Sequence, residues 1–144
     1  MPKFTISNFT LPIFLLLTAC SQSTQPEPKV TTNSIPHAIT FKTPTPGWTL
    51  TPQSAYHVGD EVWCIHKLTP PEGMVAQVIS EIKTAVTLKH TAATEKLPLK
   101  HYILGKTWKW PNQEPNLIFI DSLENIQGPL ESAIPIELAS PKNP

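Results

Sequence analysis

The strongest pattern in the chain is an alternation of apolar and polar side chains over residues 82–89. One side of an extended backbone carries Ile82, Val86 and Leu88, and the other side carries Lys83, Thr87 and Lys89. Period-two alternation of this kind predicts a half-buried β-strand. Residues 61–68 are instead apolar on both faces at their centre, which is typical of a central strand.

Three more short segments have the composition of strands, at residues 100–104, 117–120 and 134–138. We expect the last of them at the edge of a sheet, because Pro135 lacks the N–H group that a central strand needs. The chain has 17 prolines and only 5 glycines, and the prolines leave little room for long helices. The predicted fold is therefore mostly β, a single small β-sandwich or open-barrel-like domain.

Residues 69–82 are consistent with two structures. Thr69-Pro70-Pro71-Glu72 has the form of a helix-capping box, and apolar residues follow at helical spacing, which favours one short helix near residues 70–82. Gly73 and the many valines and isoleucines favour an extended chain instead. We expect a strand that runs on to residue 88, with the short helix as the alternative.

The first twenty residues have a different pattern. Lys3 precedes an apolar run that ends at Leu17, and the small residues Thr18 and Ala19 come next. This order is that of a secretory signal, and the apolar run is too short for a membrane-spanning helix. The sequence Leu17-Thr18-Ala19-Cys20 resembles the lipobox of bacterial lipoproteins.

That resemblance implies removal of the signal peptide, residues 1–19, and lipidation of Cys20. The sulfur would carry diacylglycerol and the new amino terminus an acyl chain such as palmitate, which would anchor the protein to the bilayer. Ser21 follows the cysteine, and in a Gram-negative host this implies the outer membrane, with the domain facing the periplasm. The alternatives are a disulfide between Cys20 and Cys64 or a cysteine with no special role.

The remaining chain divides by composition. Residues 20–40 are polar and rich in proline, which predicts a flexible tether, and residues 41–140 form the β-rich domain. Residues 141–144 are expected to be a disordered tail. Cys64 would then have no disulfide partner, so we expect it to be buried as a small apolar side chain.

Charge excludes one class of partner. All 11 basic residues are lysines, and loss of Lys3 with the signal leaves 10 lysines against 11 acidic residues. Nucleic-acid binding depends on dense positive charge and on arginine, so no nucleic-acid partner is expected.

Candidate catalytic and metal-binding residues are few. Cys64 and His66 share a face of one predicted strand and would form a soft metal site with His57, His90 or His101. No second clustered pair of ligands accompanies them, so an ordinary half-buried histidine, no metal and no cofactor are expected. No nucleophile lies in a recognisable catalytic motif, which predicts a protein that is not an enzyme.

Tryptophans supply the remaining candidates. Trp108 and Trp110 would point the same way on an extended chain, and Trp48 follows a predicted turn at Pro46-Gly47. Exposed aromatic rings bind sugar rings or peptide side chains, whereas buried ones fill the core. Two functions follow: a non-catalytic domain that binds another envelope protein, as an assembly accessory or an inhibitor, or a module that binds glycan or peptidoglycan fragments.

Overall fold

The computed structural model describes residues 30–111 and 114–139, and they form a mostly β fold with two sheets. The elements in chain order are β1 (Asn33–Thr43), β2 (Thr49–Val58), β3 (Glu61–Thr69), β4 (Ser80–His90), β5 (Leu99–Leu104), β6 (Leu117–Ile120), the 3-10 helix η1 (Leu123–Ile126), α1 (Gln127–Leu130) and β7 (Ile134–Ile136). None of the helices among the described residues is long and apolar enough to cross a membrane.

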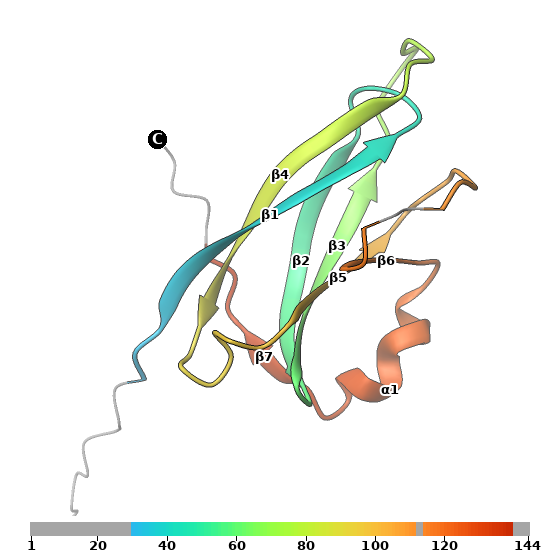
Figure 1. Ribbon diagram of the computed structural model, residues 1–144. Coiled ribbons are helices and arrows are strands. Elements are labelled where there is room, and N and C mark those ends of the chain that lie inside the picture. Colours follow the sequence, from blue (N-terminus) through green and yellow to red (C-terminus); the bar gives the residue numbers. More distant parts are fainter. Residues whose placement is uncertain (1–29, 112–113, 140–144) are drawn as a thin grey trace, which may run out of the picture.

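The larger sheet has five strands in the order β6-β5-β3-β2-β7, and β1 pairs with β4 in a separate antiparallel ribbon. The ribbon lies across one face of the larger sheet (Figure 1). Strand β3 is parallel to β5, and β5 is parallel to β6, whereas β2 is antiparallel to both of its neighbours. The predicted β-rich fold is confirmed, and its two parallel pairings are an addition to the prediction.

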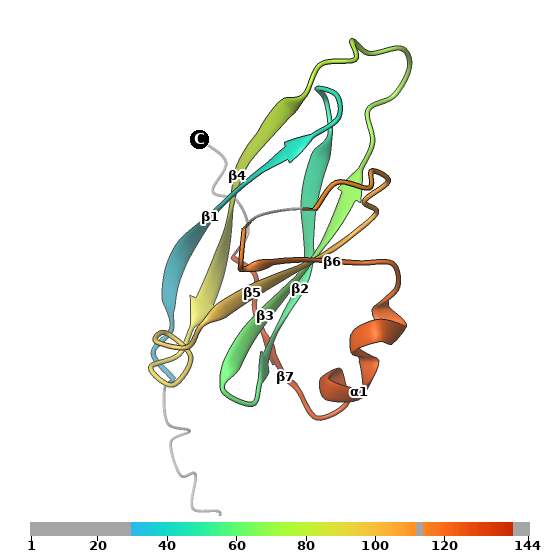
Figure 2. The ribbon, with the colours of Figure 1, turned by 45° about the vertical axis from the view of Figure 1, so that its right-hand side comes forward.

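The main core lies between the ribbon and the larger sheet. The ribbon contributes Ile39, Phe41, Val86 and Leu88, and the sheet contributes Ala55, Val62, Cys64, Leu68 and Ile103. A second cluster of Trp63, Ile65, Tyr102 and Ile126 fills the other face of the sheet, which η1 and α1 cover (Figure 2). Strand β3 therefore has buried side chains on both faces, as its sequence predicts for a central strand.

The N-terminal boundary expected from the sequence is wrong. Strand β1 begins at Asn33, inside the segment 20–40 expected to be a tether. Its inward face carries Ile35, His37, Ile39 and Phe41, which alternate with exposed residues. Pro36 is tolerated because β1 has only β4 as a neighbour, so one edge of β1 needs no ladder hydrogen bonds.

The alternative of a helix near residues 70–82 is also wrong. Residues 70–79 form an irregular loop, and β4 starts at Ser80. Gly73 has a φ of 75°, which a right-handed helix does not allow. Most of the apolar side chains at helical spacing in this loop do not pack against the domain, because Met74, Val78 and Ile79 are exposed.

The short helical elements lie elsewhere, at η1 and α1, which the sequence patterns did not indicate. Ser122 caps η1 by accepting a hydrogen bond from the Glu124 N–H group, and Asn125 completes a capping box. Strand β7 lies at one end of the larger sheet, so the edge position predicted from Pro135 is confirmed. The strand ends at Ile136, and a single bridge from Leu138 to Leu88 continues the segment onto the ribbon.

Candidate functional sites

A cluster of one cysteine and two histidines lies in the main core. Cys64 and His66 point to the same face of β3, and His101 is the register partner of Cys64 on the parallel strand β5. Cys64 and His66 have no exposed surface, and His101 is only 5% exposed. One potential ligand atom from each of the three side chains lies within 4.8 Å of the other two.

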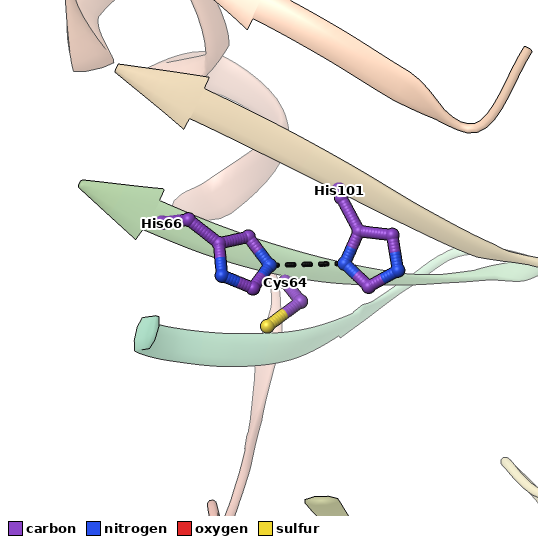
Figure 3. A group of neighbouring side chains, drawn as sticks. All are labelled: Cys64, His66 and His101. Carbon is purple, nitrogen blue, oxygen red and sulfur yellow. Dashed lines mark hydrogen bonds between the residues drawn. The ribbon is translucent and has the colours of Figure 1, made fainter. Parts of the chain in front are cut away.

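The two imidazoles are directly hydrogen-bonded. His66 Nε2 lies 2.9 Å from His101 Nδ1, and the Cys64 sulfur lies beside the pair (Figure 3). The second nitrogen of His66, Nδ1, is buried and has no hydrogen-bond partner. A buried polar atom without a partner costs free energy, so His66 is not a fully satisfied core residue.

Burial controls the protonation of the cluster. It lowers the pKa of His66 to about 3, with a smaller contribution from His101. It also lowers the pKa of His101 to about 4, with a smaller contribution from His37, and it raises the pKa of the Cys64 thiol to about 12. At neutral pH the cluster therefore consists of two neutral imidazoles and a protonated thiol.

A second histidine pair joins the two strands of the ribbon. His37 Nε2 on β1 lies 2.9 Å from His90 Nε2 on β4, and His90 Nδ1 lies 3.3 Å from the hydroxyl of Thr94. Burial and the neighbouring His90 lower the pKa of His37. His57 belongs to neither pair, so the structure brings His101 to Cys64 and His66 and places His57 and His90 elsewhere.

Three tryptophans form a cluster centred on Trp108. The Trp108 ring meets Trp48 at 5.3 Å between centroids, Trp110 at 5.5 Å and Phe119 at 6.0 Å. The Lys106 ammonium lies 4.9 Å from the Phe119 ring centre and donates to the Trp110 carbonyl at 2.7 Å. The three tryptophans expected as ligand or partner contacts are thus neighbours in space.

Their exposure differs, however. Trp48 and Trp108 are half-buried and pack against the main core, and only Trp110 is exposed, at 38%. The Trp48 N–H donates to the Thr45 hydroxyl at 3.0 Å, whereas the buried Trp108 N–H has no partner. The cluster is therefore mainly an extension of the core, with one ring at the surface.

The loop between β3 and β4, residues 70–79, is the third candidate. Met74 is fully exposed, and Val78 and Ile79 are 60% and 65% exposed. Pro71 lies against the turn between β1 and β2, where a Cβ atom on Gly47 would be only 3.0 Å from the Pro71 ring. Exposed apolar side chains gathered on one loop are typical of a protein-binding element.

Two residues complete the comparison with the sequence. Cys64 is a free, buried cysteine, as predicted, and the lipidation residue Cys20 lies outside the described residues.

Comparisons of the chain with protein-family models, with curated proteins and with solved structures found no match.

Proposed function

We propose that the protein is an envelope lipoprotein, anchored to the bilayer through acylated Cys20, whose β-rich domain binds another envelope protein without catalysis. The observation that carries the proposal is the apolar loop at residues 70–79. Three exposed aliphatic side chains on one ten-residue loop are unfavourable in water, and a partner that covers them would remove that cost.

The position of the loop supports a partner away from the membrane. Strand β1 runs the length of the domain, about 37 Å for eleven extended residues, from Asn33 to the end that carries the loop (Figures 1 and 2). Only twelve residues separate Cys20 from Asn33, which is at most ~40 Å of chain. The chain that leads to Cys20 therefore leaves the domain at the end opposite the loop, an arrangement that favours a partner on the periplasmic side.

The chemistry of the loop favours a protein over a sugar. Its large exposed apolar side chains are aliphatic, the loop has no aromatic ring, and its exposed polar side chains are those of Glu72 and Gln77. Glycan sites need an aromatic face with hydrogen-bonding groups beside it, whereas methionine is enriched in protein interfaces. The expected partner presents an apolar groove that accepts Met74, Val78 and Ile79.

Site-specific photocrosslinking in intact cells tests this proposal. A crosslinker in place of Met74 should give a discrete adduct with one other protein, and a crosslinker at the exposed Lys96, at the other end of the domain, should not. The variant Met74→Ser/Val78→Ser should lose the partner in a pull-down and keep its thermal midpoint within a few degrees, because exposed side chains contribute little to stability. Equal adducts at both positions, or full binding by the double variant, would exclude the loop as the partner-binding element.

Lipid anchoring needs a separate test. Wild-type protein should incorporate labelled palmitate and begin at residue 20, and Cys20→Ala should do neither. Three acyl chains, at ~0.8 kcal/mol for each buried methylene, would make the anchor effectively permanent. Wild-type protein that takes up no palmitate and keeps residues before 20 would contradict the lipoprotein assignment.

Glycan binding is the second candidate function. A groove of about 420 Å³ lies between Trp48 in the turn after β1 and the start of β4, where Glu81 and Lys83 provide polar groups. If this groove binds peptidoglycan fragments, purified protein should sediment with cell-wall glycan, and Lys83→Ala should weaken that binding. Absence of co-sedimentation would leave the loop as the binding element.

A further inference from the structure

We propose that Cys64, His66 and His101 form a binding site for a single monovalent copper ion, Cu(I). The three side chains supply a soft sulfur ligand and two imidazole nitrogens, and their potential ligand atoms already lie within 4.8 Å of one another. Thiolate and imidazole together are a ligand set suited to copper, and no carboxylate, which harder ions prefer, belongs to the cluster.

The arrangement needs little movement to accept an ion. The hydrogen-bonded nitrogens of His66 and His101 are 2.9 Å apart. Two imidazoles that each bind an ion at about 2.0 Å place their nitrogens roughly 3.5 Å apart in a trigonal site. The rings would therefore have to separate by about half an ångström, which small side-chain rotations provide.

The hydrogen bond between His66 and His101 leaves the buried pair incompletely satisfied. His66 Nδ1 is buried without a hydrogen-bond partner. Four ring nitrogens share two protons in the neutral pair, and the single hydrogen bond between them uses only one. An ion between His66 Nε2 and His101 Nδ1 would replace this hydrogen bond and take the lone pairs of both nitrogens, and His66 Nδ1 would then carry the proton of its ring.

Charge selects a monovalent ion. A thiolate with two neutral imidazoles carries one negative charge, so Cu(I) gives a neutral complex, whereas Zn(II) or Cu(II) would leave a net positive charge. The cluster adjoins the apolar side chains of the main core, where an uncompensated charge costs several kcal/mol. A three-coordinate site also lacks the fourth ligand that zinc prefers.

A path to the cluster starts at His101. This residue lines a surface pocket of about 160 Å³, between residues 38–40 of β1 and residues 114–117 before and at the start of β6. Binding breaks the S–H bond of Cys64 and forms a Cu–S bond, and the proton leaves to the buffer through this pocket. Copper stays in the Cu(I) state throughout, so no oxidant or reductant is consumed.

The test is an anaerobic titration of the full chain, purified in detergent without a histidine tag, with Cu(I) in competition with a colorimetric Cu(I) chelator. Wild-type protein should take up one equivalent, and Cys64→Ser and His101→Asn should weaken binding by 100-fold or more. Cys20→Ser and His57→Asn are matched controls for one cysteine and one histidine, and both should bind as wild type does.

X-ray absorption of the wild-type complex removes any dependence on the folding of the variants. The copper shell should contain one sulfur and two nitrogen neighbours. A shell without sulfur, no uptake at one equivalent, loss of binding in Cys20→Ser, or undiminished binding in folded Cys64→Ser would overturn the proposal. Zinc binding that is tighter than Cu(I) binding would overturn the choice of a monovalent ion.

Discussion

The buried histidine pair should make the metal-free protein lose stability in mild acid. His66 and His101 have folded-state pKa values of about 3 and about 4, far below the ordinary value of 6.5. Between these values the unfolded chain binds protons that the folded chain does not bind. The contribution of the two histidines to the free energy of unfolding is therefore fully present above pH 6.5 and is lost as the pH falls toward 4.

The size of the effect follows from the two shifts. On going from pH 7.5 to pH 5, a histidine with an unfolded pKa of 6.5 that stays neutral when folded loses about 2 kcal/mol of stabilisation. The two residues together give about 4 kcal/mol, and His37, whose pKa is also lowered, adds to this. A small domain has a total stability of roughly 5–15 kcal/mol, so the loss is large.

Urea denaturation at pH 7.5, 6.5, 5.5 and 5, followed by tryptophan fluorescence with a chelator present, measures this change. Exposed carboxylates stay ionised above pH 5, so the histidines dominate the window. His66→Gln should lose about half of the pH dependence of the wild-type protein. A free energy of unfolding that changes by less than about 1 kcal/mol between pH 7.5 and pH 5 would refute the conclusion that both buried imidazoles stay neutral in the folded protein.

Three further predictions use single sites. Native protein should resist thiol reagents at Cys64, whose pKa of about 12 and complete burial keep it protonated and inaccessible, and it should react fully in denaturant; rapid native labelling would place the thiol at the surface. Gly105→Ala should lower the free energy of unfolding by about 3 kcal/mol in a denaturation measurement, because φ at this residue is 99° and the new Cβ would lie 2.4 Å from a carbonyl oxygen at the end of β3. The control Gly128→Ala places its Cβ in open space and should leave the free energy of unfolding nearly unchanged. Trp108→Ala should lower the thermal midpoint strongly, at ~3 kcal/mol or more, while Trp110→Ala should shift it by only a few degrees; equal shifts would contradict the burial order.

Two of the strands that were predicted correctly, β3 and β4, have an uninterrupted side-chain pattern. Strand β4 alternates from Ile82 onward, and its buried positions in the structure are those on the apolar side of the pattern. Strand β3 is apolar on both faces and lies in the middle of the five-stranded sheet. In both strands the apolar residues occupy the positions that are buried in the structure, so the position of the strand can be predicted directly from the apolar pattern.

The strands that the sequence did not indicate are interrupted by proline or by irregular pairing. Pro36 interrupts β1, and β2 contains Pro52 together with a shift of register between Pro52 and Ser54. A bulge of this kind places two residues opposite one and breaks the period-two pattern. Proline usually indicates that a strand ends, but here Pro36 lies on a strand with one unpaired edge and Pro52 lies next to a bulge.

The loop at residues 70–79 shows the opposite error, in which a pattern has no structural counterpart. Its apolar residues have helical spacing, but helices in proteins depend mainly on packing of the apolar face, and no other element covers this one. Exposed apolar residues in this loop need a different explanation, and the proposed binding of a partner would supply one. A mismatch between a local pattern and the fold is most informative where it leaves apolar surface uncovered.

The cysteine–histidine cluster shows why half of a site is visible in the sequence and half is not. Cys64 and His66 are two residues apart on one strand, so a shared face follows from the geometry of any strand. His101 reaches them only because β5 runs parallel to β3, in a register that pairs it with Cys64. A parallel pairing is made through a long crossover, here the ribbon strand β4 and the loop after it, and no turn fixes its register. A shift of one residue would turn His101 to the other face of the sheet, toward Trp63 and away from the sulfur. The residues around His101 do not indicate that register, so a metal site that includes His101 can be inferred only once the pairing of β3 with β5 is known.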